Sequence, residues 1–104
     1  MFVATVVYEF APSTEPKAQK LFRAEMVGRR YKEQWEGLPL PKNTLWIRRT
    51  AEPSETVDDL KERCRLEVVG AAGAVRKAGL AIDLPAVWVH VMGGGTFGLV
   101  DAGS

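Results

Sequence analysis

The stretch FVATVVYEF, residues 2–10, is the clearest secondary-structure signal in this chain of 104 residues. It consists mostly of β-branched and aromatic residues, and the turn residues Ala11, Pro12 and Ser13 follow it directly. We therefore predict a β-strand here. Beyond it, long amphipathic segments alternate with short apolar runs, and that order is typical of a domain that packs helices against a sheet.

Two long segments have apolar residues three and four positions apart, the spacing of a helix face. The first covers residues 13–37, with Ser13 or Thr14 as its cap and Pro16 in its first turn. Its expected apolar face contains Leu21, Ala24, Tyr31 and Trp35, with Gly28 as a packing glycine. The second begins at residue 54, and its apolar stripe contains Val57, Leu60, Cys64, Val68, Ala71, Val75 and Ala78. Gly70 and Gly73 are expected to bend or break this second helix.

Further strands are predicted at residues 44–50 (TLWIRRT), 86–92 (AVWVHVM) and 96–100 (TFGLV), with a short edge strand at 38–40. The element order is then β-α-β-β-α-β-β. We predict an α+β fold of the ferredoxin-like kind, in which an open antiparallel sheet carries both helices on one face. Residues 1–104 form one domain in this prediction, with 101–104 frayed.

Glycines near the C-terminus have the G-x-G-x-x-G spacing of a dinucleotide-binding turn, at Gly93, Gly95 and Gly98. Such a turn leads into a helix whose amides hold the pyrophosphate, but the sequence continues for only six residues after Gly98. We therefore expect a β-hairpin, and neither a dinucleotide nor another cofactor.

Composition limits the function classes. Fourteen basic and thirteen acidic residues leave a net charge of +1, so that any binding of nucleic acid must be local. The single cysteine, Cys64, and single histidine, His90, predict no disulfide within the chain and no metal site. The first ten residues lack the pattern of a signal peptide, and no apolar stretch is long enough to span a membrane, so we expect a cytoplasmic protein.

Basic residues of the first helix are expected to lie on a solvated surface: Lys20, Arg23, Arg29, Arg30 and Lys32.

Strand alternation predicts which side chains lie on the sheet face that the helices leave open. Leu45, Ile47 and the valines of 86–92 are expected to face the helices. The open face is then expected to contain Tyr8, Phe10, Trp46, Arg48, Trp88, His90 and Met92. An aromatic patch of this size predicts a homodimer interface, a stacking platform for single-stranded nucleic acid with Arg48 or Arg49 at the phosphates, or a pocket for an apolar small molecule.

One residue is a candidate for chemistry on the properties of its side chain alone. His90 is the only side chain whose ordinary pKa lies near neutrality, so general acid or base work at neutral pH would fall to it.

The runs TVVYEF (5–10) and NTLWIRRTAEPSETVDDLKERC (43–64) resemble the ferredoxin-like endoribonucleases formed by the CRISPR adaptation nuclease subunit and the GhoS-type antitoxin. In that group the first strand ends in a Tyr-Asp pair, whereas this sequence has Tyr8 and Glu9. The resemblance implies a homodimer, a bacterial or phage defence setting and metal-assisted RNA cleavage, with Glu9 as the residue that would hold the metal. A dimeric α+β barrel of the antibiotic-biosynthesis-monooxygenase kind has the same element order.

We therefore expect a small, non-catalytic, homodimeric interaction module that binds RNA or a protein partner. The alternatives are a metal-assisted endoribonuclease that uses Glu9, and a dimeric barrel enzyme or small-ligand binder built around Trp46, Trp88 and His90.

Overall fold

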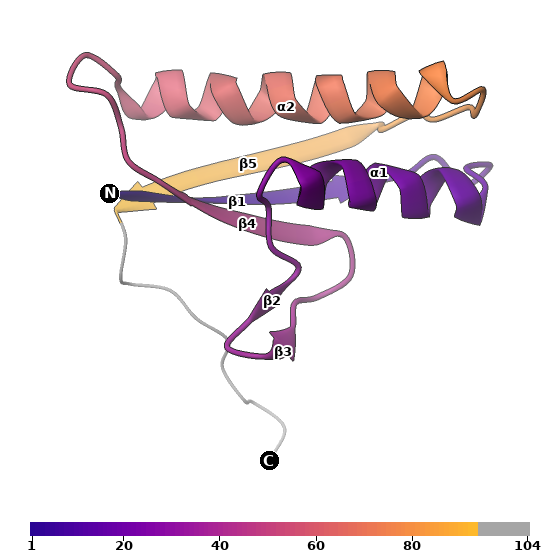
Figure 1. The fold of residues 1–104 in the computed structure, drawn as a ribbon, viewed down its shortest axis with the longest axis horizontal. Coiled ribbons are helices and arrows are strands. Elements are labelled where there is room, and N and C mark those ends of the chain that lie inside the picture. The colour runs from indigo at the N-terminus through magenta and orange to yellow at the C-terminus, as the bar shows by residue number, and fades with distance from the viewer. Residues whose placement is uncertain (94–104) are drawn as a thin grey trace.

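The computed structural model describes residues 1–93, which form two helices, a three-stranded sheet and a two-stranded hairpin (Figure 1). The helices are α1 (Pro16–Gly28) and α2 (Val57–Lys77). The strands are β1 (Phe2–Glu9), β2 (Gln34–Trp35), β3 (Leu38–Pro39), β4 (Thr44–Arg49) and β5 (Ala86–Gly93). The α+β class predicted from the sequence is confirmed.

The main sheet has the strand order β4-β1-β5, and β1 runs antiparallel to both neighbours. Val6 of β1 pairs with Leu45 of β4 on one side and with Val89 of β5 on the other. The expected edge strand at 38–40 exists as β3, but it pairs with β2 in a separate sheet. The strand expected at 96–100, and with it most of the glycine-rich hairpin, lies outside the described residues.

Both helices pack on the same face of this sheet. The buried core joins Ala4 and Val6 of β1 and Leu45 and Ile47 of β4 to both helices, and Val89 and Val91 of β5 pack against it. The predicted stripe of α2 is confirmed for Leu60, Cys64, Val68, Ala71 and Val75, all of which are buried. Strand periodicity and helix periodicity therefore identified the main layers correctly.

The expected bend or break in α2 was wrong, because the helix runs unbroken through Gly70 and Gly73 and is straight in Figure 1. A glycine inside a helix costs only about 1 kcal/mol relative to alanine, and buried side chains on both sides of this pair hold the helix against the sheet.

The start of α2 is capped by a reciprocal pair of hydrogen bonds. The Thr56 hydroxyl accepts the Asp59 amide, and the Asp59 carboxylate accepts the Thr56 amide.

The expected extent of α1 was also wrong. The helix ends at Gly28, and its buried face consists of Ala18, Phe22 and Met26 rather than the predicted set. Gly28 is not a packing glycine, because a Cβ atom built there meets nothing within 4 Å. The chain leaves the helix because Arg30 has a φ of 76°, in the left-handed region that ends helices.

Within residues 1–93, neither helix is both long and apolar enough to span a lipid bilayer.

The unbroken α2 predicts opposite effects for alanine at two glycines. Gly73 lies inside the helix with open space around its Cβ position, so Gly73→Ala should raise the free energy of unfolding by up to about 1 kcal/mol. Gly79 follows the helix with a φ of 86°, so Gly79→Ala should lower it by about 1 kcal/mol. Urea denaturation measures both. A loss of stability in Gly73→Ala would contradict the continuous helix.

Candidate functional site

Tyr8 lies in the core and not on the open face where it was expected. Ala4, Val6 and Tyr8 share one side of β1, and that side faces the helices. Tyr8 is 3% exposed and contacts Phe22 of α1 edge to face, with 5.0 Å between ring centroids. Phe10 packs partly buried against the same cluster. The prediction failed because β1 is apolar on both sides, so that alternation alone did not identify the buried one.

Trp46 lies on the open side of β4 but is covered. Trp35 of β2 contacts it edge to face at 4.9 Å, and the Trp46 indole N–H donates to the Gln34 carbonyl at 2.8 Å. The cations of Lys32 and Arg48 lie 6.0 and 5.6 Å from its ring centroid. With 6% of its surface exposed, Trp46 offers no platform for a base.

Three of the predicted open-face residues remain exposed: Arg48, Trp88 and His90. Trp88 is 56% exposed, and its ring centroid lies 5.4 Å from that of His90. Met92 is partly buried. Among residues 1–93, the exposed aromatic part of the predicted open face is therefore smaller than expected and lies on β5.

The two candidates for chemistry are not brought together. On β1, Glu9 pairs with Ala86 and Thr5 pairs with His90, which separates Glu9 from His90 by about 13 Å along the strands. Both side chains are exposed. Within the described part of the chain, no three His, Cys, Asp or Glu side chains cluster in a way that could hold a metal ion.

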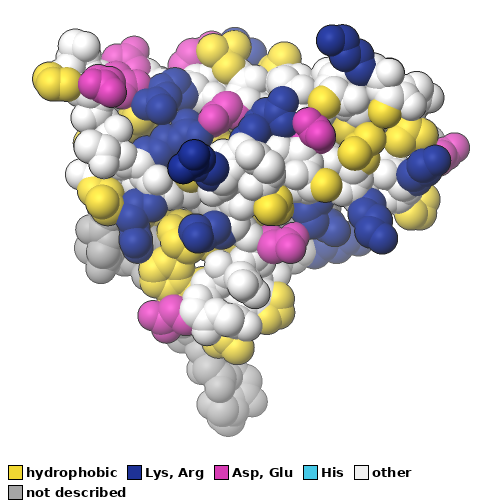
Figure 2. Space-filling model, viewed as in Figure 1, with side chains coloured by type: hydrophobic (Ala, Val, Ile, Leu, Met, Phe, Trp, Pro, Cys, Tyr) yellow, Lys and Arg dark blue, Asp and Glu magenta, His cyan; other side chains and the backbone are white. Residues whose placement is uncertain are grey.

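A groove of about 1080 Å³ lies between the end of α1, the end of β4 and the first half of α2. Six cationic side chains line it, and only two carboxylates, Glu33 and Glu67, accompany them. Figure 2 shows dark blue side chains gathered on this part of the surface, below α2. The cations are Arg29, Arg30, Lys32, Arg48, Arg49 and Arg63.

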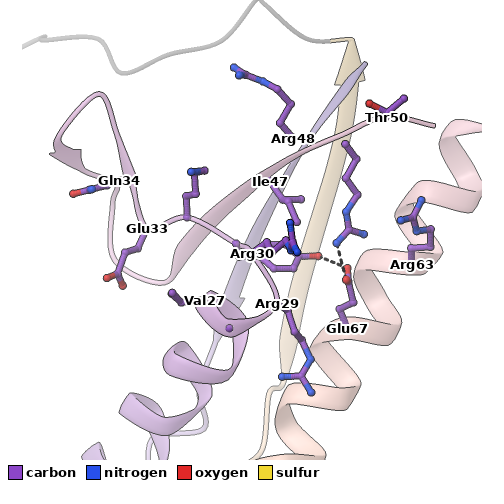
Figure 3. Close-up of a pocket in the computed structure, with 14 residues that line it drawn as sticks. Val27, Arg29, Arg30, Glu33, Gln34, Ile47, Arg48, Thr50, Arg63 and Glu67 are labelled. Atoms are coloured by element: carbon purple, nitrogen blue, oxygen red, sulfur yellow. Dashed lines mark hydrogen bonds and ion pairs between the residues drawn. The ribbon is translucent and has the colours of Figure 1, made fainter. Parts of the chain in front are cut away.

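Glu67 of α2 organises one wall of this groove (Figure 3). One carboxylate oxygen accepts the Tyr31 hydroxyl at 2.8 Å, and the other accepts the Arg49 guanidinium at 2.6 Å. Arg49 also lies over the Tyr31 ring, 5.7 Å from its centroid. Burial raises the pKa of Tyr31 above its ordinary value, so the hydroxyl remains a donor at neutral pH. Burial works against the charged form of Arg49, but the Glu67 hydrogen bond and charge outweigh it and raise the pKa of the guanidinium.

The remaining cations reach the groove from different elements (Figure 3). Arg29 donates to the carbonyl and the carboxylate of Glu25, one turn earlier in α1. Arg63 of α2 pairs with Glu55 at 3.0 Å and remains 45% exposed. The sequence analysis expected Arg29, Arg30 and Lys32 on a solvated helix surface and did not consider Arg63. Only the fold brings residues 27–34, 47–50 and 63–67 together, so no local motif could have indicated the groove.

A smaller cavity of about 260 Å³ lies between β1, α1 and the hairpin of β2 and β3. Tyr8 and Asn43 line it, and within residues 1–93 the buried Tyr8 hydroxyl and the buried Asn43 side-chain oxygen have no hydrogen-bond partner. Burial raises the pKa of Tyr8, although the nearby Arg23 guanidinium works in the opposite direction. The chain therefore contains one buried tyrosine whose hydroxyl is hydrogen-bonded and one whose hydroxyl is not.

These two tyrosines predict different results for the same substitution. Tyr31→Phe removes a hydrogen bond to a carboxylate and should lower the free energy of unfolding by about 1 to 2 kcal/mol. Tyr8→Phe removes a buried hydroxyl without a partner and should leave stability unchanged or raise it. Urea denaturation of both variants makes the comparison. Equal losses would show that the bond to Glu67 contributes nothing specific.

Comparison with known proteins finds no matching family model, no matching curated protein and no matching solved structure.

Proposed function

We propose that this protein is a non-catalytic interaction module that binds single-stranded RNA in the basic groove. The observation that carries the proposal is the local excess of positive charge. Six cations and two carboxylates line the groove, whereas the whole chain has a net charge of only +1. A concave surface lined by one sign of charge concentrates its field and attracts a polyanion.

The residue types suit a partner that offers anionic oxygens in pairs, such as a phosphate. Five of the six groove cations are arginines, whose planar guanidinium donates two parallel hydrogen bonds to a phosphate. One of the two acids, Glu67, is already bound to Arg49 and Tyr31 inside the protein. Glu25 and Glu55 pair with Arg29 and Arg63 in the same way, so the groove cations without an ion pair in residues 1–93 are Arg30, Lys32 and Arg48.

The open sheet face supports a single strand in particular. Arg48 lies in one row with Val3 and Met92, and Trp88 lies on the same face of β5. Standard sheet spacings place Trp88 about 10 Å across the sheet and 13 Å along it from Arg48. Bases can stack on an exposed aromatic ring only when they are unpaired. A strand held at Arg48 could therefore reach Trp88 and His90.

Two arginines of α2 provide a matched test. Arg63 lines the groove and pairs with Glu55, whereas Arg65 pairs with Glu62 and does not line it. Arg63→Ala should weaken binding of a short oligouridine RNA about three- to tenfold. In a plot of log K against the logarithm of the salt concentration, it should make the slope shallower by about 0.7. Arg65→Ala should change neither. Fluorescence anisotropy across a salt series measures both.

Three results would contradict the proposal. The first is an absence of RNA binding by the unaltered protein. The second is an equal effect of the two substitutions, which would indicate attraction to the surface as a whole. The third is stronger binding of polyglutamate than of RNA, which would favour an acidic protein partner instead.

We further propose that the sheet belongs to the ferredoxin-like class. Both flanking strands run antiparallel to the central β1, and an isolated antiparallel bridge joins Lys32 to Trp46 beside β4, where a fourth strand of that fold would lie. The cytoplasmic location and the bacterial or phage defence setting are proposals that rest on the sequence and on its resemblance to the small endoribonucleases.

The homodimer stays a prediction as well, and it competes with base stacking for the surface of Trp88. Trp88 is 56% exposed and Val7 37% exposed, and they are paired neighbours on the open face. Apolar surface of this kind is commonly covered by a second copy of the chain. Light scattering should give a mass of about twice 11.4 kDa, and Trp88→Ala should shift the equilibrium toward the monomer. A monomeric unaltered protein would contradict the prediction and leave Trp88 free for bases.

A further inference from the structure

The chain ends α1 with an unusual residue. The Arg30 amide donates to the Val27 carbonyl at 2.9 Å, and the Tyr31 amide donates to the Met26 carbonyl at 3.2 Å. This pair of bonds is the Schellman motif, in which the residue at the position of Arg30 takes a left-handed conformation and is usually glycine. Arg30 takes that conformation, with a φ of 76°.

The end of α2 shows the ordinary form of the same motif. The Gly79 amide donates to the Arg76 carbonyl at 2.9 Å, and the Leu80 amide donates to the Val75 carbonyl at 3.3 Å. Gly79 has a φ of 86°. The protein thus builds one motif twice, with glycine in one copy and arginine in the other. Since a side chain is unfavourable in this conformation and glycine is not, the backbone of α1 would be more stable with glycine at residue 30.

Contacts inside the protein do not account for the arginine. Arg30 is exposed, and within residues 1–93 its side chain forms no hydrogen bond or ion pair. A cation near the end of a helix is favoured by the helix dipole, but Arg29 already provides one and donates to the Glu25 carbonyl. What the side chain of Arg30 does have is a place in the basic groove.

We infer that Arg30 is a phosphate-binding residue of the groove, held there at the expense of backbone stability. Its guanidinium contacts the phosphodiester backbone of the bound strand and therefore acts regardless of base sequence. This inference rests on the proposed function and extends it, because it names the part of the RNA that is recognised and a residue that recognises it.

Arg30→Gly should have two opposite effects. Relief of the left-handed conformation should raise Tm by about 4 to 8 °C. Loss of the guanidinium should weaken binding of oligouridine and oligoadenosine RNA by the same factor, about five- to tenfold. The slope of log K against the logarithm of the salt concentration should become shallower by about 0.7 for both RNAs. Arg30→Ala is the matched control. It removes the same guanidinium but keeps the strain, so it should weaken binding equally and leave Tm nearly unchanged.

The possible results are distinguishable. A higher Tm with unchanged RNA affinity in Arg30→Gly would overturn the inference while leaving the groove as the binding site. A lower Tm would also overturn it, because Arg30 would then support the fold. A different loss for the two RNA sequences would assign Arg30 to base recognition. If the unaltered protein binds neither RNA, the proposed function fails, and the inference fails with it.

Discussion

The carboxylate of Glu67 is the point on which the candidate site depends. Its two oxygens bind Tyr31 and Arg49, which belong to the segment after α1 and to the end of β4, while Glu67 itself belongs to α2. Three parts of the chain that are distant in sequence are thereby fixed around one charge. Removal of one partner from a partly buried ion pair leaves the other uncompensated, so these three residues are best understood as one structural unit.

Ion pairs explain how so many cations can coexist in a small volume. Arg49 is compensated by Glu67, Arg29 by Glu25 and Arg63 by Glu55. These ion pairs limit mutual repulsion among the guanidinium groups, and those of Arg29 and Arg63 lie far enough toward solvent to exchange their partners for a ligand. Arg49 differs, because its side chain is only 13% exposed. Within one groove, therefore, some arginines maintain the architecture and others are available to bind.

The sequence predicted those features that repeat along the chain. The stripe of α2 and the alternation on β4 and β5 recur several times, and each recurrence strengthens the interpretation. The end of α1 depends instead on the backbone conformation of one residue, Arg30, and nearby Gly28 and Gly37 drew attention to the wrong positions. Tyr8 was misplaced for a related reason, since valines on both sides of β1 made the two faces look alike. The groove could not be predicted because its residues meet only after the layers have packed.

One buried side chain gives the protein an internal chemical reporter. Cys64 is the only thiol in the chain, is fully buried on α2, and lies next to Arg63 and one turn before Glu67. Burial raises the pKa of its thiol, which further suppresses the reactive thiolate. An alkylating reagent can therefore modify Cys64 only while α2 is detached from the sheet. The rate of labelling consequently measures how often α2 detaches. A ligand that binds α2 and β4 together must slow that rate, whatever its chemical identity.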